Sequence, residues 1–271
     1  MYRTMNNLTA IVTGASEGLG KSLALELAER GIHLILVALP DSRLNELAEY
    51  IKKNYSVAVY QFELDLTNAD SCQSLFSNLK DLNIKADILI NNAGLGNLNS
   101  FADRDIAFYK MQIELNVIAP VLLTRLFLDQ IDKKQECYLL NVGSLGGQFL
   151  VPKKQVYGAT KSFISYFTKC LQVELAGTPV KISLLCPGGI NTKPELLVLN
   201  SRLKGIAQYT ILEPEQVAGK AIDGLLKGKK EIVPGILNQL LLKLDFFLPE
   251  FIKNRIIRNS IIKKQSTVVI S

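Results

Sequence analysis

The segment TGASEGLG, Thr13–Gly20, decides the fold. It follows a short apolar run, Thr9–Thr13, and it opens a segment of helical period, Lys21–Arg30. Its three glycines let the backbone turn sharply and approach a phosphate without a Cβ in the way. The helix that follows offers free N–H groups and the positive end of its dipole. A glycine turn between the first strand and the first helix predicts a dinucleotide site, although the spacing here is GxxxGxG and not GxGxxG.

The rest of the chain alternates short apolar runs with longer segments of helical period. Strands that are apolar throughout and separated by helices indicate a parallel sheet covered on both faces, which is a doubly wound α/β or Rossmann fold. We expect a single domain over residues 1–235, followed by a helical extension over 236–271. The expected strands are Thr9–Thr13, His33–Ala38, Val57–Glu63, Ala86–Ile90, Glu136–Val142, Lys181–Cys186 and Glu231–Val233. The main expected helices are Lys21–Arg30, Ser42–Asn54, Ser71–Leu82, Asp103–Leu128, Tyr157–Ala176 and Pro214–Lys227.

Composition excludes several classes of function. The chain has 271 residues with 31 Lys and Arg against 25 Asp and Glu, and the net charge of +6 is too small to indicate nucleic-acid binding. His33 is the only histidine, which excludes Ser-His-Asp hydrolysis, Cys-His proteolysis and histidine-ligated metals. The four cysteines lack CxxC spacing, so we expect reduced thiols, no metal site and a cytoplasmic protein.

With histidine excluded, a tyrosine is the candidate acid/base. Tyr157 and Lys161 are four residues apart on one expected helix and therefore face the same way. A nearby ammonium favours the phenolate, so we expect the pKa of Tyr157 to be lowered toward the range useful for acid/base catalysis. Ser144 lies thirteen residues upstream at the end of an expected strand, where it can join this pair.

Together these motifs resemble the short-chain dehydrogenase/reductase family, over roughly residues 6–235. Beyond the glycine turn, the matching elements follow in the family's order. They are Asp65-Leu66, Asn91-Asn92-Ala93-Gly94, Asn116, Ser144, Tyr157-Gly158-Ala159-Thr160-Lys161, Pro187-Gly188 and Thr192. The segment Thr13–Leu39 is also similar to the ketoacyl and 17β-hydroxysteroid reductase branch of the family.

The resemblance implies an oxidoreductase that transfers a hydride between NAD(P)(H) and a carbonyl or alcohol substrate. It implies that Tyr157 transfers the proton, that Ser144 donates a hydrogen bond to the substrate oxygen, and that Lys161 binds the nicotinamide ribose. It also implies that Asn116 distorts its helix locally, so that a water can continue the proton relay. The cofactor contacts that it implies are Gly14, Ser16, Glu17, Gly18, Leu19, Gly20, Leu39, Asp65, Leu66, Asn92, Ala93, Gly94, Asn116, Tyr157, Lys161, Pro187, Gly188, Ile190 and Thr192.

The choice between NAD and NADP stays open. An acid at the end of the second strand binds the 2′-OH of NAD, and an arginine just after it binds the 2′-phosphate of NADP, but here the residues are Ala38 and Leu39. Glu17 would repel a phosphate. Arg43 either reaches a 2′-phosphate or is an ordinary surface charge.

Substrate and assembly are less constrained. The apolar residues of Glu195–Ile211 either floor a pocket for an apolar, lipid-like carbonyl compound or pack against the sheet. The alternative to an enzyme is a catalytically silent nucleotide sensor or scaffold on the same fold, against which the complete Asn-Ser-Tyr-Lys set argues. The resemblance also implies a homo-oligomer, a dimer or tetramer, formed through Asp103–Leu128 and Ser162–Ala176.

The C-terminal extension lies beyond the resemblance. On a helix from Ile236, the residues Ile236, Leu237, Leu240, Leu241, Leu244, Phe247 and Leu248 share one face, while Asn238, Gln239, Lys243 and Asp245 share the other. Pro249 should end this helix. The stretch 250–264 then carries five basic residues against Glu250. Three interpretations stay open: a flap over the substrate mouth or a partner subunit, a core helix with a solvated tail, or a membrane-surface helix. From the third we predict weak, salt-sensitive association of residues 236–264 with anionic membranes.

Overall fold

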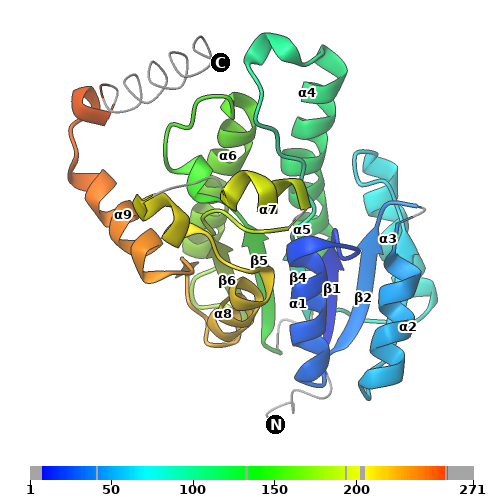
Figure 1. Ribbon diagram of the computed structural model, residues 1–271. Helices are drawn as coiled ribbons and strands as arrows, with labels where there is room; N and C mark the ends of the chain where they lie inside the picture. The colour runs from blue at the N-terminus through cyan, green and yellow to red at the C-terminus, as the bar shows by residue number, and fades with distance from the viewer. Residues whose placement is uncertain are drawn as a thin grey trace.

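The computed structural model describes residues 8–40, 42–131, 134–192, 194–201, 205–253 and 255. At its centre is a seven-stranded sheet of order β3-β2-β1-β4-β5-β6-β7, in which every described pairing is parallel (Figure 1). The strands are β1 (Thr9–Thr13), β2 (His33–Ala38), β3 (Val59–Glu63), β4 (Ile88–Asn91), β5 (Cys137–Val142), β6 (Val180–Leu185) and β7 (Glu231–Ile232).

Helices cover both faces of this sheet, which confirms the doubly wound α/β fold. One face is covered by α1 (Gly18–Glu29), α2 (Leu44–Asn54) and α8 (Pro214–Leu226), and the other by α3 (Ala69–Asp81), α5 (Ala119–Gln130) and α6 (Gln155–Glu174). The remaining helices are α4 (Ile106–Ile113), α7 (Pro194–Ser201) and α9 (Ile236–Phe247), with the short turns η2 (Phe101–Asp103), η4 (Leu145–Gly147) and η5 (Gly205–Thr210).

The apolar strands form because alternate side chains enter two separate cores. In β1, Ala10 and Val12 pack in the α1–α8 core, while Ile11 packs in the α3–α5 core, and all three are fully buried. Edge strand β3 differs, because Tyr60, Gln61 and Glu63 are exposed to solvent. The expectation that the sheet is apolar on both faces therefore holds for the inner strands and fails at this edge.

The expected single helix over Asp103–Leu128 is divided. The structure has α4, then a π-helix η3 (Glu114–Ile118), then α5. The continuous run Ile106–Gln130 is long and apolar enough to cross a membrane by length and composition. Ala119, Leu123 and Phe127 of this run are buried against the sheet, which accounts for its apolar character.

The extension begins as α9, and this helix ends shortly before Pro249. The expected division of α9 into a buried apolar face and an exposed polar face does not hold, because Asn238 is 1% exposed while Ile236 is 78% exposed. Leu240 and Leu244 are exposed as well, whereas Leu242 packs inward beside Leu145, Ile164 and Leu184. The core-helix interpretation is therefore wrong for this face. Residues 256–271, with three of the five expected basic charges, lie outside the described residues.

Candidate active site

The candidate site lies at the carboxyl edge of the sheet, where β1 and β4 are neighbours and the strand order reverses. Loops that diverge at such a point leave a crevice in which α/β proteins bind their ligands. The glycine turn follows β1, and the Asn91-Asn92-Ala93-Gly94 segment follows β4, so the fold brings these two predicted elements together.

The glycine turn is shaped as a cradle for a phosphate. Gly14 and Gly18 have φ values of +64° and +54°, which side chains rarely adopt. A Cβ on Gly20 would lie 1.9 Å from the carbonyl oxygen of Gly14, so no other residue fits there. A Cβ on Gly18 would lie 2.9 Å from the Cβ of Thr192. The turn and the loop after β6 therefore face each other across the start of α1, and the residues fit a bound pyrophosphate.

Thr13 and Asn92 join the two loops. The Thr13 hydroxyl accepts hydrogen bonds from the backbone N–H groups of Asn92 and Ala93, each at 3.0 Å. In return, the Asn92 amide donates to the carbonyl oxygens of Thr13 at 2.9 Å and Gly14 at 3.2 Å. These bonds fix the conformation of both loops before any ligand binds.

The other expected cofactor contacts surround this cradle. The side chain of Leu39 is exposed at the end of β2, and the carboxylate of Asp65 accepts hydrogen bonds from the backbone and hydroxyl of Thr67 at 2.9 and 2.8 Å. Leu19 and Leu66 lie in the two cores, so only their backbone can face a ligand. Pro187, Gly188 and Ile190 lie in the loop after β6, on the Thr192 side, while the Ser16 and Glu17 positions belong to the turn itself.

Asn116 lies at the centre of the π-helix, where it holds the loop after β4. Its side-chain oxygen accepts a hydrogen bond from the backbone N–H of Leu95 at 2.8 Å, and its amide donates to the Leu95 carbonyl at 3.0 Å. The same amide donates to the Thr160 hydroxyl at 3.1 Å. A Cβ on Gly94 would lie 3.2 Å from the Asn116 oxygen and 3.5 Å from the Lys161 nitrogen. Asn116 and Lys161 thus lie on one side of the same loop.

Tyr157 lies between two backbone segments. Cβ atoms on Gly96 and Gly146 would approach opposite edges of its ring, at 3.4 and 3.6 Å from Cε2 and Cε1. The Ser144 hydroxyl accepts a hydrogen bond from the Gly146 N–H at 3.0 Å, and it is also hydrogen-bonded to the Tyr157 hydroxyl. Ser144 and Tyr157 are therefore close enough to hold one substrate oxygen between them.

The pKa expectation for Tyr157 is wrong for the protein without cofactor. Burial of the phenol raises its pKa, and the hydrogen bond with Ser144 lowers it by less. The Lys161 ammonium is 5.9 Å from the ring centroid and donates to the Val142 carbonyl at 2.8 Å. Burial also lowers the pKa of Lys161 to about 8. Two buried groups that each disfavour their charged form cannot be recognised as such from a four-residue spacing.

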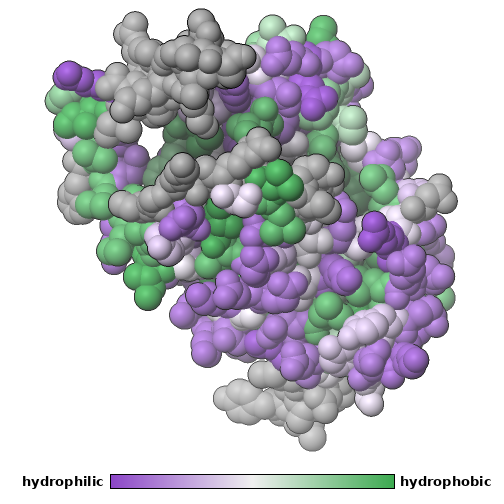
Figure 2. Space-filling model, viewed as in Figure 1, coloured by the Kyte–Doolittle hydropathy of each residue, from purple (hydrophilic) through white to green (hydrophobic). Residues whose placement is uncertain are grey.

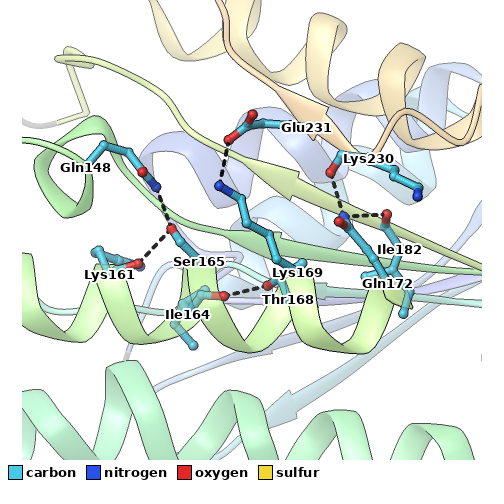
Figure 3. Close-up of polar contacts among 10 residues, drawn as sticks. All are labelled: Gln148, Lys161, Ile164, Ser165, Thr168, Lys169, Gln172, Ile182, Lys230 and Glu231. Carbon is cyan, nitrogen blue, oxygen red and sulfur yellow. Dashed lines mark hydrogen bonds and ion pairs between the residues drawn. The ribbon is translucent and has the colours of Figure 1, made fainter. Parts of the chain in front are cut away.

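Contacts along α6 hold these side chains in place (Figure 3). Gln148, in the loop after β5, donates to the Ser165 hydroxyl at 3.0 Å. Gln172 donates to the carbonyl oxygens of Ile182 and Lys230, and the Lys169 ammonium lies 3.7 Å from the Glu231 carboxylate. The helix that carries Tyr157 and Lys161 is thus attached to β6, to β7 and to the loop that carries Ser144.

Sequence reasoning missed several residues that support the site. Thr13 and Thr160 belong to the quoted motifs but were given no role, although their positions beside Gly14 and Lys161 could have suggested one. Gln112 is fully buried and donates to the Leu95 carbonyl at 2.9 Å and to Asn97 at 3.1 Å, one helical turn before Asn116. No sequence signal indicated it. Among the described residues, no cluster of three or more His, Cys, Asp or Glu side chains could hold a metal ion.

Comparisons with known proteins agree with this geometry. A family model described as short chain dehydrogenase matches residues 8–196. The chain is 33% identical over 191 residues to the NADP-dependent 3-hydroxy acid dehydrogenase of Schizosaccharomyces pombe, which covers 70% of this chain and 74% of that protein. It is 30% identical over 189 residues to the very-long-chain 3-oxoacyl-CoA reductase of Bos taurus, covering 68% of this chain and 60% of that protein.

A solved structure is similar over most of its length. The short-chain dehydrogenase from Sphingobium yanoikuyae in complex with NADPH has a TM-score of 0.74 and 25% identity, and the match covers 90% of this chain and 97% of that one. Because the family model spans more than half of the sequence, the chain belongs to the short-chain dehydrogenase/reductase family of oxidoreductases, near its ketoacyl reductase branch.

Proposed function

We propose that the protein interconverts a carbonyl compound and its alcohol, with Tyr157 as the general acid/base. The observation that carries the proposal is the convergence of Ser144, Tyr157, Lys161 and Asn116 beside the glycine turn, from three different elements. A nicotinamide dinucleotide, NAD or NADP, bound between the turn and Thr192 would supply or accept the hydride. The solved relative that binds NADPH supports this choice of cofactor.

The chain's own groups have distinct roles in this reaction. The Ser144 oxygen accepts a hydrogen bond from Gly146, so its hydrogen, which is directed at the Tyr157 hydroxyl, can be donated to a substrate oxygen bound between the two side chains. Tyr157 gives its proton to that oxygen during reduction and takes it back during oxidation. The Lys161 ammonium uses one hydrogen for Val142 and keeps two for ribose hydroxyls. The π-helix at Asn116 alters the backbone bonding pattern, and we assign to it the water that links Lys161 to solvent.

We infer that the substrate is a 3-oxo compound with an apolar chain. The two curated relatives named above are a 3-hydroxy acid dehydrogenase and a 3-oxoacyl-CoA reductase, and both names place the reacting oxygen on the third carbon. Leu197, Val198 and Tyr209 are exposed on α7 and η5, and Figure 2 shows apolar side chains in a hollow beside α9. This surface suits an alkyl chain.

Leu39 and Ala38 at the end of β2 do not distinguish NAD from NADP, so both cofactors are to be included in the assay.

Replacing Tyr157 by phenylalanine tests the reaction. Tyr157→Phe removes the hydroxyl, and with it the transferable proton and the hydrogen bond with Ser144, so we expect turnover to fall by about 10²- to 10⁴-fold. Tyr166→Phe, on the exposed side of the same helix, is the matched control and should keep full activity. NADH and NADPH titrations followed by cofactor fluorescence should give the same affinity for all three proteins. Near-normal turnover by Tyr157→Phe would contradict the assignment, and a wild type that binds nucleotide but turns over no carbonyl compound would favour the silent alternative.

We further propose a homo-oligomer formed through α4, α5 and α6. Ile113, Ile118, Phe163, Tyr166 and Val173 are exposed apolar or aromatic side chains on this surface. Light scattering at micromolar concentration should give the mass of a dimer or tetramer. A monomer would contradict the proposal.

We also propose a cytoplasmic protein that binds weakly to anionic membranes through α9. All four cysteines are free thiols, and three of them are buried, which suits a reducing compartment. The exposed Ile236, Leu240 and Leu244 lie next to a stretch whose basic charge complements an anionic surface. Sedimentation with anionic vesicles should therefore show binding at low salt that is lost at high salt. Equal binding to neutral vesicles would contradict the role of charge.

A further inference from the structure

A second lysine lies beside the ring of Tyr157. Lys154 is the residue from which α6 begins, and its ammonium is 5.3 Å from the centroid of the Tyr157 ring, closer than the 5.9 Å of Lys161. The family resemblance assigns no role to this position, and neither does the proposed mechanism. Tyr157 thus has two ammonium groups near it, of which only Lys161 is explained.

The Lys154 ammonium has no counter-ion in the described part of the chain. Its side chain is partly buried, burial lowers its pKa, and no carboxylate of the described residues pairs with it. The first turn of α6 contains no acidic residue, and the helix dipole adds positive potential at this end. By contrast, the exposed Lys169 lies near Glu231, and the half-buried Lys181 lies near Glu136. The Tyr157 ring is a weak partner for an ammonium that is partly removed from water, so a negative charge from outside the chain would be favourable beside it.

We propose that Lys154 binds a carboxylate of the substrate, next to the carbonyl group that Tyr157 and Ser144 hold. The inference rests on the proposed function and narrows its substrate from 3-oxo compounds in general to free 3-oxo acids. The Lys154 ammonium lies over the ring that carries the proton-donating hydroxyl of Tyr157. The substrate groups that contact this ammonium and this hydroxyl must therefore be close together in the substrate. A 3-oxo acid has a single methylene between carbonyl and carboxylate, whereas a thioester has no charge at that position.

Lys154 takes no part in proton or hydride transfer in this scheme. It stays an ammonium and forms a charge-assisted hydrogen bond, which is about twice as strong as a neutral one. The alkyl chain then extends away from Lys154 toward the apolar residues Leu197, Val198 and Tyr209. Polar recognition at one end and apolar contact at the other would fix which face of the carbonyl meets the cofactor.

A matched pair of substrates tests the proposal. The probes are 3-hydroxyhexanoate and its methyl ester, oxidised with whichever of NAD and NADP the protein prefers. We expect Lys154→Met to lower kcat/KM for the acid by about 10- to 100-fold, mainly through KM, because that is the strength of a hydrogen bond to a charged group. For the ester, kcat/KM of the same variant should differ from that of the wild type by less than about threefold. Lys154→Arg should keep most of the wild-type kcat/KM for the acid. Lys153→Met, at the neighbouring exposed lysine, should leave kcat/KM unchanged for both substrates.

The acid–ester difference separates this role from others. An equal loss on both probes, with an alkaline shift of the pH profile, would overturn the proposal and indicate that Lys154 acts on Tyr157. A wild type that prefers the ester would also overturn it. If the wild type oxidises neither probe, the proposed reaction fails, and calorimetric titration of 3-hydroxyhexanoate into the protein with bound cofactor then decides. Binding that Lys154→Met weakens supports the carboxylate site, and absence of binding overturns it.

Discussion

The glycine turn after β1 and helix α9 both contact the loop after β6, since a Cβ on Gly18 would lie 2.9 Å from the Cβ of Thr192 and a Cβ on Gly188 would lie 2.8 Å from the Asn238 amide. In the turn, backbone packs on backbone, and it is held by hydrogen bonds that the Thr13 hydroxyl accepts and the Asn92 amide donates. In α9, one buried polar residue attaches the helix while Leu240 and Leu244 face solvent. The turn is held by its own hydrogen bonds without a ligand, whereas α9 exposes apolar side chains to solvent.

The proposed function, in which the turn binds a dinucleotide and α9 lies over a substrate with an alkyl chain, accounts for this difference. A pyrophosphate has one shape in every dinucleotide, so a rigid turn can be built for it in advance. A substrate with an alkyl chain enters and leaves at each turnover, and the elements over it need few fixed contacts. Substitutions should therefore have large effects in the turn and small effects on stability along α9.

The largest effect is expected for Gly20→Ala. The new Cβ would lie 1.9 Å from the Gly14 oxygen and 2.6 Å from the Asn92 amide, so the turn must change its backbone path. We expect a loss of about 3 kcal/mol or more in the free energy of unfolding, together with loss of nucleotide binding. Urea unfolding and cofactor fluorescence measure the two effects.

The same substitution at Gly219 is the matched control. A Cβ there meets only Glu26 at 3.6 Å, in ordinary contact, within the interior of α8. Gly219→Ala should raise the free energy of unfolding by about 0.5–1 kcal/mol, because alanine favours a helix. If both variants have similar stability, the turn is less rigid than its contacts indicate.

Lys161→Met should show how much stability the burial of the Lys161 ammonium costs. The folded-state pKa of Lys161 is about 8, against 10.5 for a free lysine. Between these values the unfolded chain binds more protons, so the stability of the wild type rises with pH in this range, and the full penalty applies below it. We therefore compare the free energy of unfolding of the variant with that of the wild type at two pH values. The difference, variant minus wild type, should be about 2 kcal/mol larger at pH 7 than at about pH 9.5.

Chemical denaturation at the two pH values checks this expectation. Lys169→Met, at an exposed position of the same helix, should show a difference from wild type that changes by less than about 0.5 kcal/mol. A pH-independent difference for Lys161→Met would mean that the buried ammonium is solvated in a way that its contacts do not reveal.

The two regions also differ in how far the sequence predicts them. The turn was predictable because Gly14, Gly18 and Gly20 are required by backbone geometry that no other residue type satisfies. The same holds for β1, whose alternation of Ala10, Ile11 and Val12 matches a strand buried on two faces. Where residue type alone determines conformation, sequence reasoning succeeds.

It fails where burial depends on partners distant in sequence. Helical period placed Asn238 on the outer face of α9, yet it is buried because carbonyl oxygens of Thr210 and Pro234 accept its hydrogen bonds. The spacing of Tyr157 and Lys161 predicted a lowered phenol pKa, but burial by the loops around Gly96 and Gly146 raises it. Tertiary packing decides both outcomes, and no local pattern encodes it.

A smaller effect is expected for Asn238→Ala. The change removes two hydrogen bonds, of 3.1 Å to Thr210 and 2.9 Å to Pro234, at a residue only 1% exposed. We expect a loss of about 1–2 kcal/mol in the free energy of unfolding, and a higher KM for substrate because η5 and α9 are less firmly joined. Gln239→Ala, which removes one exposed bond to Val233, should lose no more than about 0.5 kcal/mol. Equal losses from the two variants would show that Asn238 does not attach the helix.

The smallest effect on stability is expected where α9 faces solvent. Leu240 and Leu244 are 50% and 59% exposed, so the double variant Leu240→Lys, Leu244→Lys should change the free energy of unfolding by less than about 0.5 kcal/mol. Leu82→Lys, at the exposed C-terminal end of α3, is the control, because α3 and α9 lie on opposite sides of the molecule in Figure 1. Sedimentation with anionic vesicles distinguishes the two proposed roles of this face, membrane binding and a flap over the substrate. The two added lysines increase the attraction to anionic lipid, so loss of binding by the double variant can only come from lost apolar contact. Binding that is unchanged or stronger would mean that charge alone holds the protein to the membrane. A fall in kcat/KM with unchanged vesicle binding would instead assign α9 to a flap over the substrate.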